Sequence, residues 1–147
     1  MRRALIAAFV MVAVITFAAG FLVGATTTAM HRIGNQAAIK AVGVAVYQDP
    51  ALTVPLTEIS WGILEPGEYK NHTAYIKNES NVPITLALIT ENWNPLNAPK
   101  FIALTWDYDG QPLQVDGFLK VTFTLAVDSA ISGIETFSFD IVIVGSG

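Results

Sequence analysis

Two stretches in the second half of the chain alternate between apolar side chains and smaller or polar ones. Residues 119–127 read LKVTFTLAV and residues 136–144 read TFSFDIVIV. A period of two is the repeat of a β-strand with one buried face, whereas an amphipathic helix repeats its apolar residues every three or four positions. The alternation therefore predicts two strands whose inward faces carry Phe123 and Leu125 in one case, and Phe139, Ile141 and Ile143 in the other.

Five further segments have the length and composition of strands, at residues 39–47, 56–60, 69–78, 82–90 and 101–106. Turn-forming residues separate them. In the sequence Glu65-Pro66-Gly67-Glu68, Pro fixes φ and Gly supplies the positive φ of a type II turn. Seven short strands with polar turns predict an all-β fold, a seven-stranded antiparallel sandwich.

Residues 4–25, ALIAAFVMVAVITFAAGFLVGA, contain no charged side chain. A helix of this length spans roughly 33 Å, which is about the thickness of the hydrocarbon core of a bilayer. We expect one N-terminal hydrophobic helix, with Arg2 and Arg3 on the cytoplasmic side and the rest of the chain outside. The length favours a retained anchor. A long signal peptide cleaved after Ala25 or Ala29 is the alternative.

This interpretation divides the chain into a transmembrane anchor or signal segment at residues 1–29 and an extracellular β-sandwich domain at residues 30–147. The expected location is the cell membrane or the cell surface. The chain has no cysteine, so disulfides and thiolate metal sites are excluded.

Residue chemistry gives little support to catalysis. The chain carries twelve Asp and Glu against eight Lys and Arg, with a net charge of −4, which argues against a nucleic-acid partner. The two histidines, His31 and His72, have no obvious catalytic partners in the sequence. We therefore expect no enzyme activity and no cofactor.

Two asparagines lie in the N-glycosylation pattern Asn-x-Ser/Thr, namely Asn71-His72-Thr73 and Asn78-Glu79-Ser80. Such triplets have meaning only on the outside of a membrane, where this part of the chain is expected. We predict that Asn71 and Asn78 are both exposed and glycosylated.

A weak calcium-binding pattern appears at Asp107-Tyr108-Asp109-Gly110, because closely spaced carboxylates near a Gly bend can surround a hard cation. Asp116 is the one further carboxylate that could complete the site. The later ligands of a calcium loop are missing, so a hairpin turn is the favoured interpretation and no metal site is assigned.

The segment Leu64-Glu65-Pro66-Gly67, a following strand, and Asn78-Glu79-Ser80-Asn81-Val82-Pro83 before another strand together resemble a pattern of exported immunoglobulin-like modules. These include the camelysin/TasA-type biofilm-fibre subunits of bacteria and archaea. Small archaeal surface proteins with one N-terminal span and such a sandwich are the most similar. The resemblance covers about residues 59–144 and implies an immunoglobulin-like fold, without assigning a function by itself.

In fibre subunits of the resembled type, an N-terminal strand is donated to the next subunit. The corresponding segment is residues 38–47, AIKAVGVAVY, in which Val42, Val44 and Val46 form the expected apolar row. An ordinary edge strand in its own domain is the simpler alternative.

The sequence as a whole predicts a structural or adhesive glycoprotein of the cell surface, an envelope component or a filament subunit. Its expected partners are the membrane, further copies of itself or other envelope proteins. An archaeal type IV pilin-like or stator protein is one alternative, although Gly20, Gly24 and Thr26 interrupt the helix that a pilin would continue. A carbohydrate- or calcium-binding surface module is the other.

Overall fold

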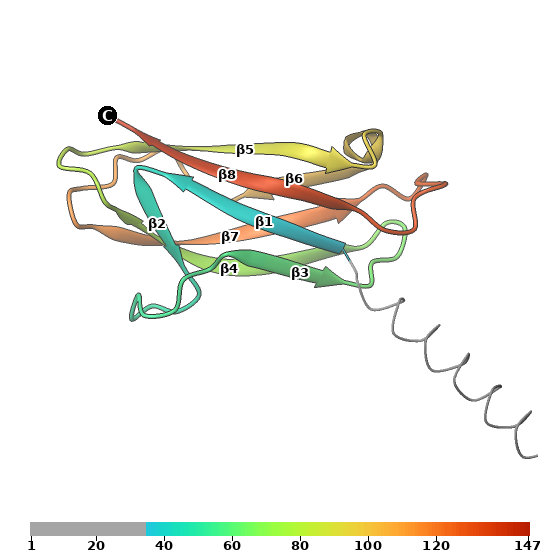
Figure 1. Ribbon diagram of the computed structural model, residues 1–147, viewed down its shortest axis with the longest axis horizontal. Helices are drawn as coiled ribbons and strands as arrows, with labels where there is room; N and C mark the ends of the chain where they lie inside the picture. The colour runs from blue at the N-terminus through green and yellow to red at the C-terminus, as the bar shows by residue number, and fades with distance from the viewer. Residues whose placement is uncertain (1–34) are drawn as a thin grey trace, which may run out of the picture. The chain divides into compact units, whose positions relative to one another are not determined.

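The computed structural model describes residues 35–147, and these residues form a sandwich of two four-stranded β-sheets (Figure 1). Sheet A has the strand order β3-β1-β8-β5, and sheet B has the order β2-β4-β7-β6. The strands are β1 (Asn35–Val42), β2 (Val44–Tyr47), β3 (Glu58–Gly62), β4 (Tyr69–Asn78), β5 (Thr85–Asn94), β6 (Ile102–Trp106), β7 (Phe118–Val127) and β8 (Ser138–Ser146). A short 3-10 helix, η1 (Ala98–Lys100), precedes β6. The predicted all-β fold with two sheets is confirmed.

The hydrophobic helix predicted at residues 4–25 lies outside the described residues, as does His31. Within residues 35–147, no helix combines the length and the hydropathy that are needed to cross a bilayer.

The sandwich has eight strands and not the predicted seven, because the first predicted strand is divided at Gly43. Gly43 has a φ of +74°, and a Cβ atom there would lie 3.3 Å from the carbonyl oxygen of Gly145. Glycine adopts this conformation without the steric cost that other residues incur. At this point the chain leaves sheet A, which contains β1, and enters sheet B, which contains β2.

One pair of neighbouring strands runs parallel, so the prediction of a wholly antiparallel sandwich is wrong at this pair. In it β1 lies beside β8, with Ala37 opposite Phe139 and Ile39 opposite Ile141. The other strand pairs of the two sheets are antiparallel. A parallel pair needs a long connection and not a tight turn, and here that connection is the whole of the domain between β1 and β8.

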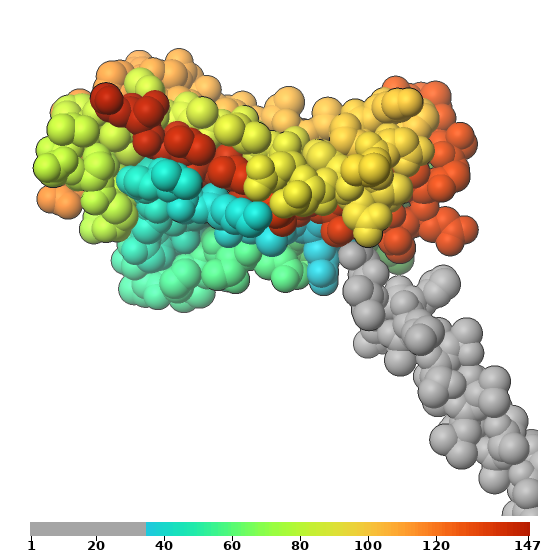
Figure 2. Space-filling view, turned by 45° about the horizontal axis from the view of Figure 1, so that its top comes forward, coloured from blue at the N-terminus to red at the C-terminus, as the bar shows by residue number. Residues whose placement is uncertain are grey.

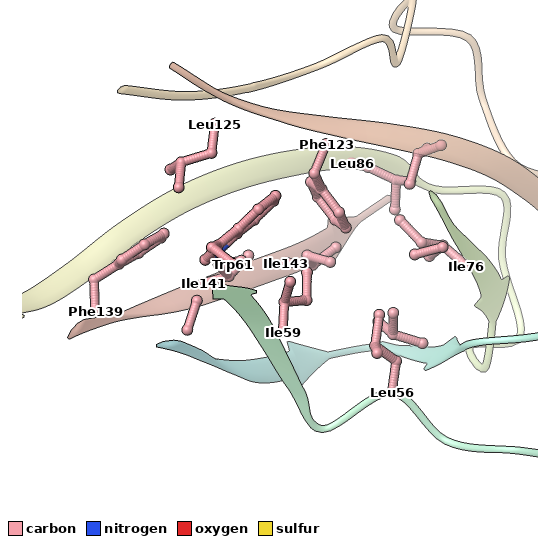
Figure 3. Packing of buried hydrophobic residues seen from close by; sticks show 14 of the residues in the cluster. Leu56, Ile59, Trp61, Ile76, Leu86, Phe123, Leu125, Phe139, Ile141 and Ile143 are labelled. Carbon is pink, nitrogen blue, oxygen red and sulfur yellow. The ribbon is translucent and has the colours of Figure 1, made fainter. Parts of the chain in front are cut away.

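The hydrophobic core fills the space between the two sheets (Figure 3). Phe123 and Leu125 of β7 are fully buried, as are Ile141 and Ile143 of β8. Their burial confirms the inward faces predicted from the alternation. Each such side chain contributes about 1.5–3 kcal/mol through the removal of apolar surface from water.

The turns and strand ends follow the local sequence in most places. Gly67 has a φ of +81°, and the N–H of Glu68 donates to the carbonyl of Glu65, as the predicted type II turn requires. Strand β4 has the predicted bounds. Strand β5 continues four residues beyond its predicted end because Asn92, with a φ of +54°, lies where the pairing with β8 shifts register and then resumes.

Candidate functional site

Strand β1 lies in the middle of sheet A, between β3 and β8 (Figures 1 and 2). On one side it runs antiparallel to β3, with Gln36 opposite Ser60 and Ala38 opposite Glu58. On the other side it runs parallel to β8 from Gln36 to Val42. We call the position between β3 and β8 the β1 slot. A strand in this slot is held by hydrogen-bond ladders on both edges.

Strand β1 contacts the core with few apolar side chains. Ala37 is fully buried and Ile39 is half-buried, whereas Ala41 and Val42 are exposed. Burial of apolar surface contributes about 25 cal/mol per Å², so these two side chains give a modest hydrophobic contribution. The ladders and the polar side chains of β1 therefore carry a large share of its attachment.

The first polar contact lies at the start of β1. Asn35 is buried, and its Nδ2 donates to the carbonyl oxygen of Gly62 at 2.9 Å. Its Oδ1 accepts from the N–H of Phe137 at 3.1 Å. The amide therefore links the end of β3 to the segment that leads into β8. A buried amide is stable only when such partners are present.

The second polar contact lies on the outer face of sheet A. The Nζ atom of Lys40 is 2.7 Å from Oδ2 of Asp140 on β8 and 3.3 Å from Oε1 of Glu91 on β5. The side-chain amide of Asn92 also donates to Oδ2 of Asp140, at 2.7 Å. Two carboxylates on neighbouring strands thus face the single ammonium group that β1 supplies.

These contacts change the proton affinities of both partners. Hydrogen bonds from Asn92 and then from Lys40 lower the pKa of Asp140. Hydrogen bonds to Asp140 and then to Glu91 raise the pKa of Lys40. Each shift favours the charged form, so Lys40 and Asp140 are both ionised at neutral pH.

The predicted strand-donation residues divide between the two sheets. Val44 and Val46 on β2 are buried, whereas Val42 at the end of β1 is 56% exposed. The expected row of three valines is therefore a row of two, because the turn at Gly43 reverses which face of the chain points inward. The predicted segment 38–47 contributes β1 to the middle of sheet A, and it contributes β2 to the edge of sheet B.

Asn71 has the position that a glycosylated asparagine requires. It is exposed on β4, and its Oδ1 accepts a hydrogen bond from Oγ1 of Thr124 at 2.8 Å. Thr73, the third residue of the triplet, lies two positions later on the same strand and so on the same face. The Nδ2 atom, to which a glycan would be joined, is on the outer surface of sheet B.

Asn78 is fully buried, and the prediction that it is exposed is wrong. Its Nδ2 lies 2.8 Å from the carbonyl oxygen of Val82, 3.1 Å from that of Leu113 and 3.2 Å from that of Gln114. Its Oδ1 accepts from the N–H of Ser80 at 2.8 Å. This side chain therefore holds two loops together. The Asn-x-Ser pattern arises here from a turn in which asparagine and serine bond to nearby backbone groups.

The three candidate calcium ligands do not converge. Asp107 and Asp109 line an open recess of about 330 Å³, and Asp116 does not. Oδ1 of Asp107 accepts from the N–H of Thr122, and Oδ1 of Asp109 accepts from the N–H of Gln111. In the part of the chain that the structure describes, no three His, Cys, Asp or Glu side chains are grouped so that they could hold a metal ion. Asp107 and Asp109 here stabilise the backbone of the β6–β7 connection.

His72 packs against the aromatic core. Its ring lies 6.2 Å from that of Trp61 in an edge-to-face arrangement, and burial lowers its pKa. The neutral form is therefore favoured at pH 7. Trp61 is 3% exposed and His72 is half-buried, so His72 packs at the margin of the interior between β3 and β4.

Sequence reasoning missed the polar side chains that hold β1 in its slot. Asn35 lies before the predicted strand, and Asp140 and Glu91 lie far from Lys40 in the sequence. The one available signal was Lys40 itself, which is the only charge in the otherwise apolar segment AIKAVGVAVY. Opposite charges on neighbouring strands form stabilising pairs, so this lysine indicated a carboxylate partner on an adjacent strand.

Comparison with known proteins gives no assignment, since no protein-family model and no curated protein matches the chain. The function must therefore be argued from the geometry of the described residues. The most distinctive feature of the described domain is that its first strand, β1, lies beside its last strand, β8, in the middle of sheet A.

Proposed function

We propose that this chain is a structural subunit of the cell surface, held at the membrane by residues 4–25, and that its sandwich domains are joined by exchange of strand β1. The position of β1 carries the proposal. It is the first strand of the described domain, yet it lies in the middle of sheet A. No described strand precedes it, so β1 can leave its slot without drawing another strand of the sandwich with it. A second copy of the chain can then supply the same strand.

An empty β1 slot would be unstable. The facing edges of β3 and β8 would both present unpaired N–H and C=O groups, which bind any available strand. Ile59 on β3 and Ile141 on β8, which are buried beside Ala37 and Ile39 of β1, would be less well covered. The slot therefore requires a strand, either from its own chain or from a neighbour, and strand addition of this kind is an established mode of protein association.

The connection between β1 and β2 favours exchange. It consists of Gly43 alone, so a short loop holds β1 between the two sheets. Short hinge loops of this kind promote domain swapping, because an extended hinge relieves the tight turn. The swapped strand makes the same contacts as the original one, so protein concentration and the hinge decide between the two states.

The remaining features support an exported structural role. Residues 4–25 are long and apolar enough for a span, and Asn71 presents its amide on the outer face of sheet B. The resemblance to camelysin/TasA-type and other immunoglobulin-like surface modules rests on the turn at Gly67 and on strand β4, and both are present in the described domain. The family and the immunoglobulin-like topology are part of this proposal.

Sedimentation of the compact unit Gly34–Gly147 tests the proposal. The protein is refolded from urea at low and at high concentration and then analysed at equal concentration. Exchange of β1 predicts oligomers after refolding at high concentration. A monomer of about 12 kDa under both conditions, at roughly 110 Da per residue for one small domain, would contradict it.

A locked variant gives the matched control. Ala38→Cys and Glu58→Cys introduce the only cysteines of the chain at positions directly opposite each other on β1 and β3. Oxidation at low concentration would fix β1 in its own slot, because paired strand positions allow a disulfide. The oxidised variant should stay monomeric at every concentration, and reduction should restore assembly.

A further inference from the structure

Strand β1 turns only Ala37 and Ile39 into the core, so hydrophobic contacts specify its register weakly. A displacement of one residue would turn Ala37 and Ile39 outward, but a displacement of two residues would keep the same face toward the core. The alternate positions on this face carry Asn35, Ala37, Ile39 and Ala41, so an alignment displaced by two residues would still turn alanine and isoleucine side chains toward the core. Polar contacts that exist in only one alignment add to the choice of register.

We infer that the side chains of Asn35 and Lys40 together determine how β1 binds in its slot: in one register, with one face inward and in one direction. We call this pair of residues the polar address. Asn35 binds at the start of the slot, where it contacts Gly62 and the N–H of Phe137. Lys40 binds on the outer face, where it contacts Asp140 and Glu91.

The spacing of the two residues makes the address selective. They are five positions apart, and because five is odd they point to opposite faces of the strand. Asn35 is buried and Lys40 is exposed, as this requires. A displacement by two residues moves β1 by roughly 6.6 Å and separates Asn35 from both of its partners. Reversal of the strand would place Asn35 at the wrong end of the slot.

The strand that this address selects is β1 of a second copy of this chain. That β1 comes from another copy rests on the proposed function. The address itself applies equally when β1 comes from the same chain. The two ideas can therefore fail separately, and one experiment can distinguish them.

The experiment uses the full-length chain with two disulfide reporters. Ala38→Cys with Glu58→Cys reads the observed register, and Ala38→Cys with Ser60→Cys reads a displacement by two residues. The yield of each disulfide is measured by mass spectrometry after oxidation, and links within and between chains are counted together. With Asn35 and Lys40 intact, the first reporter should exceed the second by about tenfold or more, which corresponds to one or two net hydrogen bonds.

Removal of the address should reduce this preference. In the variant Asn35→Ala with Lys40→Met, the ratio of the two yields should fall by roughly tenfold. Lys120→Met removes an exposed lysine from the outer face of sheet B and should leave the ratio unchanged. Lys40→Glu should lower the ratio, and Lys40→Glu with Asp140→Lys should restore it, which a merely destabilised strand would not do.

An unchanged ratio in both Asn35→Ala with Lys40→Met and Lys40→Glu would overturn the inference. If the ratio responds as expected but the links lie entirely within single chains, the address stands and the exchange of β1 between copies fails.

Discussion

The Nζ atom of Lys40 lies 2.7 Å from Oδ2 of Asp140, so an ion pair joins the first strand of the sandwich to the last. The pKa of Asp140 is lowered in the folded state, so its contribution to stability is present above the pKa of an unfolded aspartate, about 3.9. That contribution is lost as the pH falls through the lower folded-state value. The pKa of Lys40 is raised, so its contribution is present below about 10.4 and is lost as the pH rises through the higher folded-state value.

Asp140→Asn should therefore flatten the acid side of the stability profile. The parent protein is expected to lose stability between pH 5 and pH 2, at about the range of an aspartate, and the variant should lose less. Urea unfolding at several pH values measures this difference. Because the Lys40 side chain is 51% exposed and the pair lies on the outer face of sheet A, the effect should be small and should decrease in high salt. Identical pH profiles for parent and variant would show that the pair does not contribute.

Asn78→Ala should destabilise the sandwich strongly. It removes the fully buried amide that joins the carbonyl groups of Val82, Leu113 and Gln114, and it leaves the N–H of Ser80 without its acceptor. The expected loss is about 2–4 kcal/mol in urea unfolding. Asn71→Ala, on the exposed face of β4, should cost under about 1 kcal/mol. Equal effects of the two substitutions would contradict the structural role of Asn78.

Glycosylation should occur at Asn71 and not at Asn78 in the folded protein. The Nδ2 atom of Asn78 is buried and hydrogen-bonded, whereas Asn71 is exposed. The intact mass of the protein from membranes of its native host should exceed that of the bare polypeptide, and Asn71→Gln should remove the whole excess. A glycopeptide that contains modified Asn78 would refute this prediction.

Gly43→Ala should destabilise the domain through both its backbone and its surroundings. The positive φ costs roughly 1 kcal/mol for an L-residue, and the new Cβ would crowd the carbonyl oxygen of Gly145. Gly110→Ala is the matched control, because Gly110 also has a positive φ but no atom within 4 Å of an added Cβ. Thermal unfolding should show a greater loss at Gly43. A greater loss at Gly110 would mean that the approach to Gly145 is unimportant.

Phe123→Ala and Phe139→Ala should each cost about 3–5 kcal/mol, because both rings are buried between the sheets. Thr124→Ala, next to Phe123 but on the outer face of β7, should cost under about 1 kcal/mol. Thermal melts compare the three. Similar losses at Phe123 and Thr124 would show that the inward face of β7 is wrongly assigned.

The parts of the fold that could be predicted from the sequence are those governed by local patterns. The alternation of apolar with smaller or polar side chains predicted the inward faces of β7 and β8, and the Pro66-Gly67 turn predicted the start of β4. Gly43 was present in the sequence, but an isolated glycine in a strand pattern signals a bulge as readily as a change of sheet. The extra strand therefore could not be predicted from the local pattern alone.

The candidate site was harder to predict, because it is assembled from distant positions. The contact between Asn35 and Phe137 joins residues 102 positions apart, and no local pattern encodes it. Asn78 shows the opposite problem. Its triplet matches a glycosylation pattern, but burial decides its role, and the triplet carries no information about burial.

The source of β1 is tested most directly in a mixture of two full-length chains that each carry one cysteine, Ala38→Cys in one and Glu58→Cys in the other. Neither chain can form the paired disulfide alone, so this link requires β1 of one copy to lie in the slot of another. After joint refolding and oxidation, strand exchange predicts a disulfide-linked heterodimer that mass spectrometry assigns to positions 38 and 58. If the heterodimer does not form, while one chain with both cysteines forms the link internally, β1 belongs to its own domain and the account is wrong.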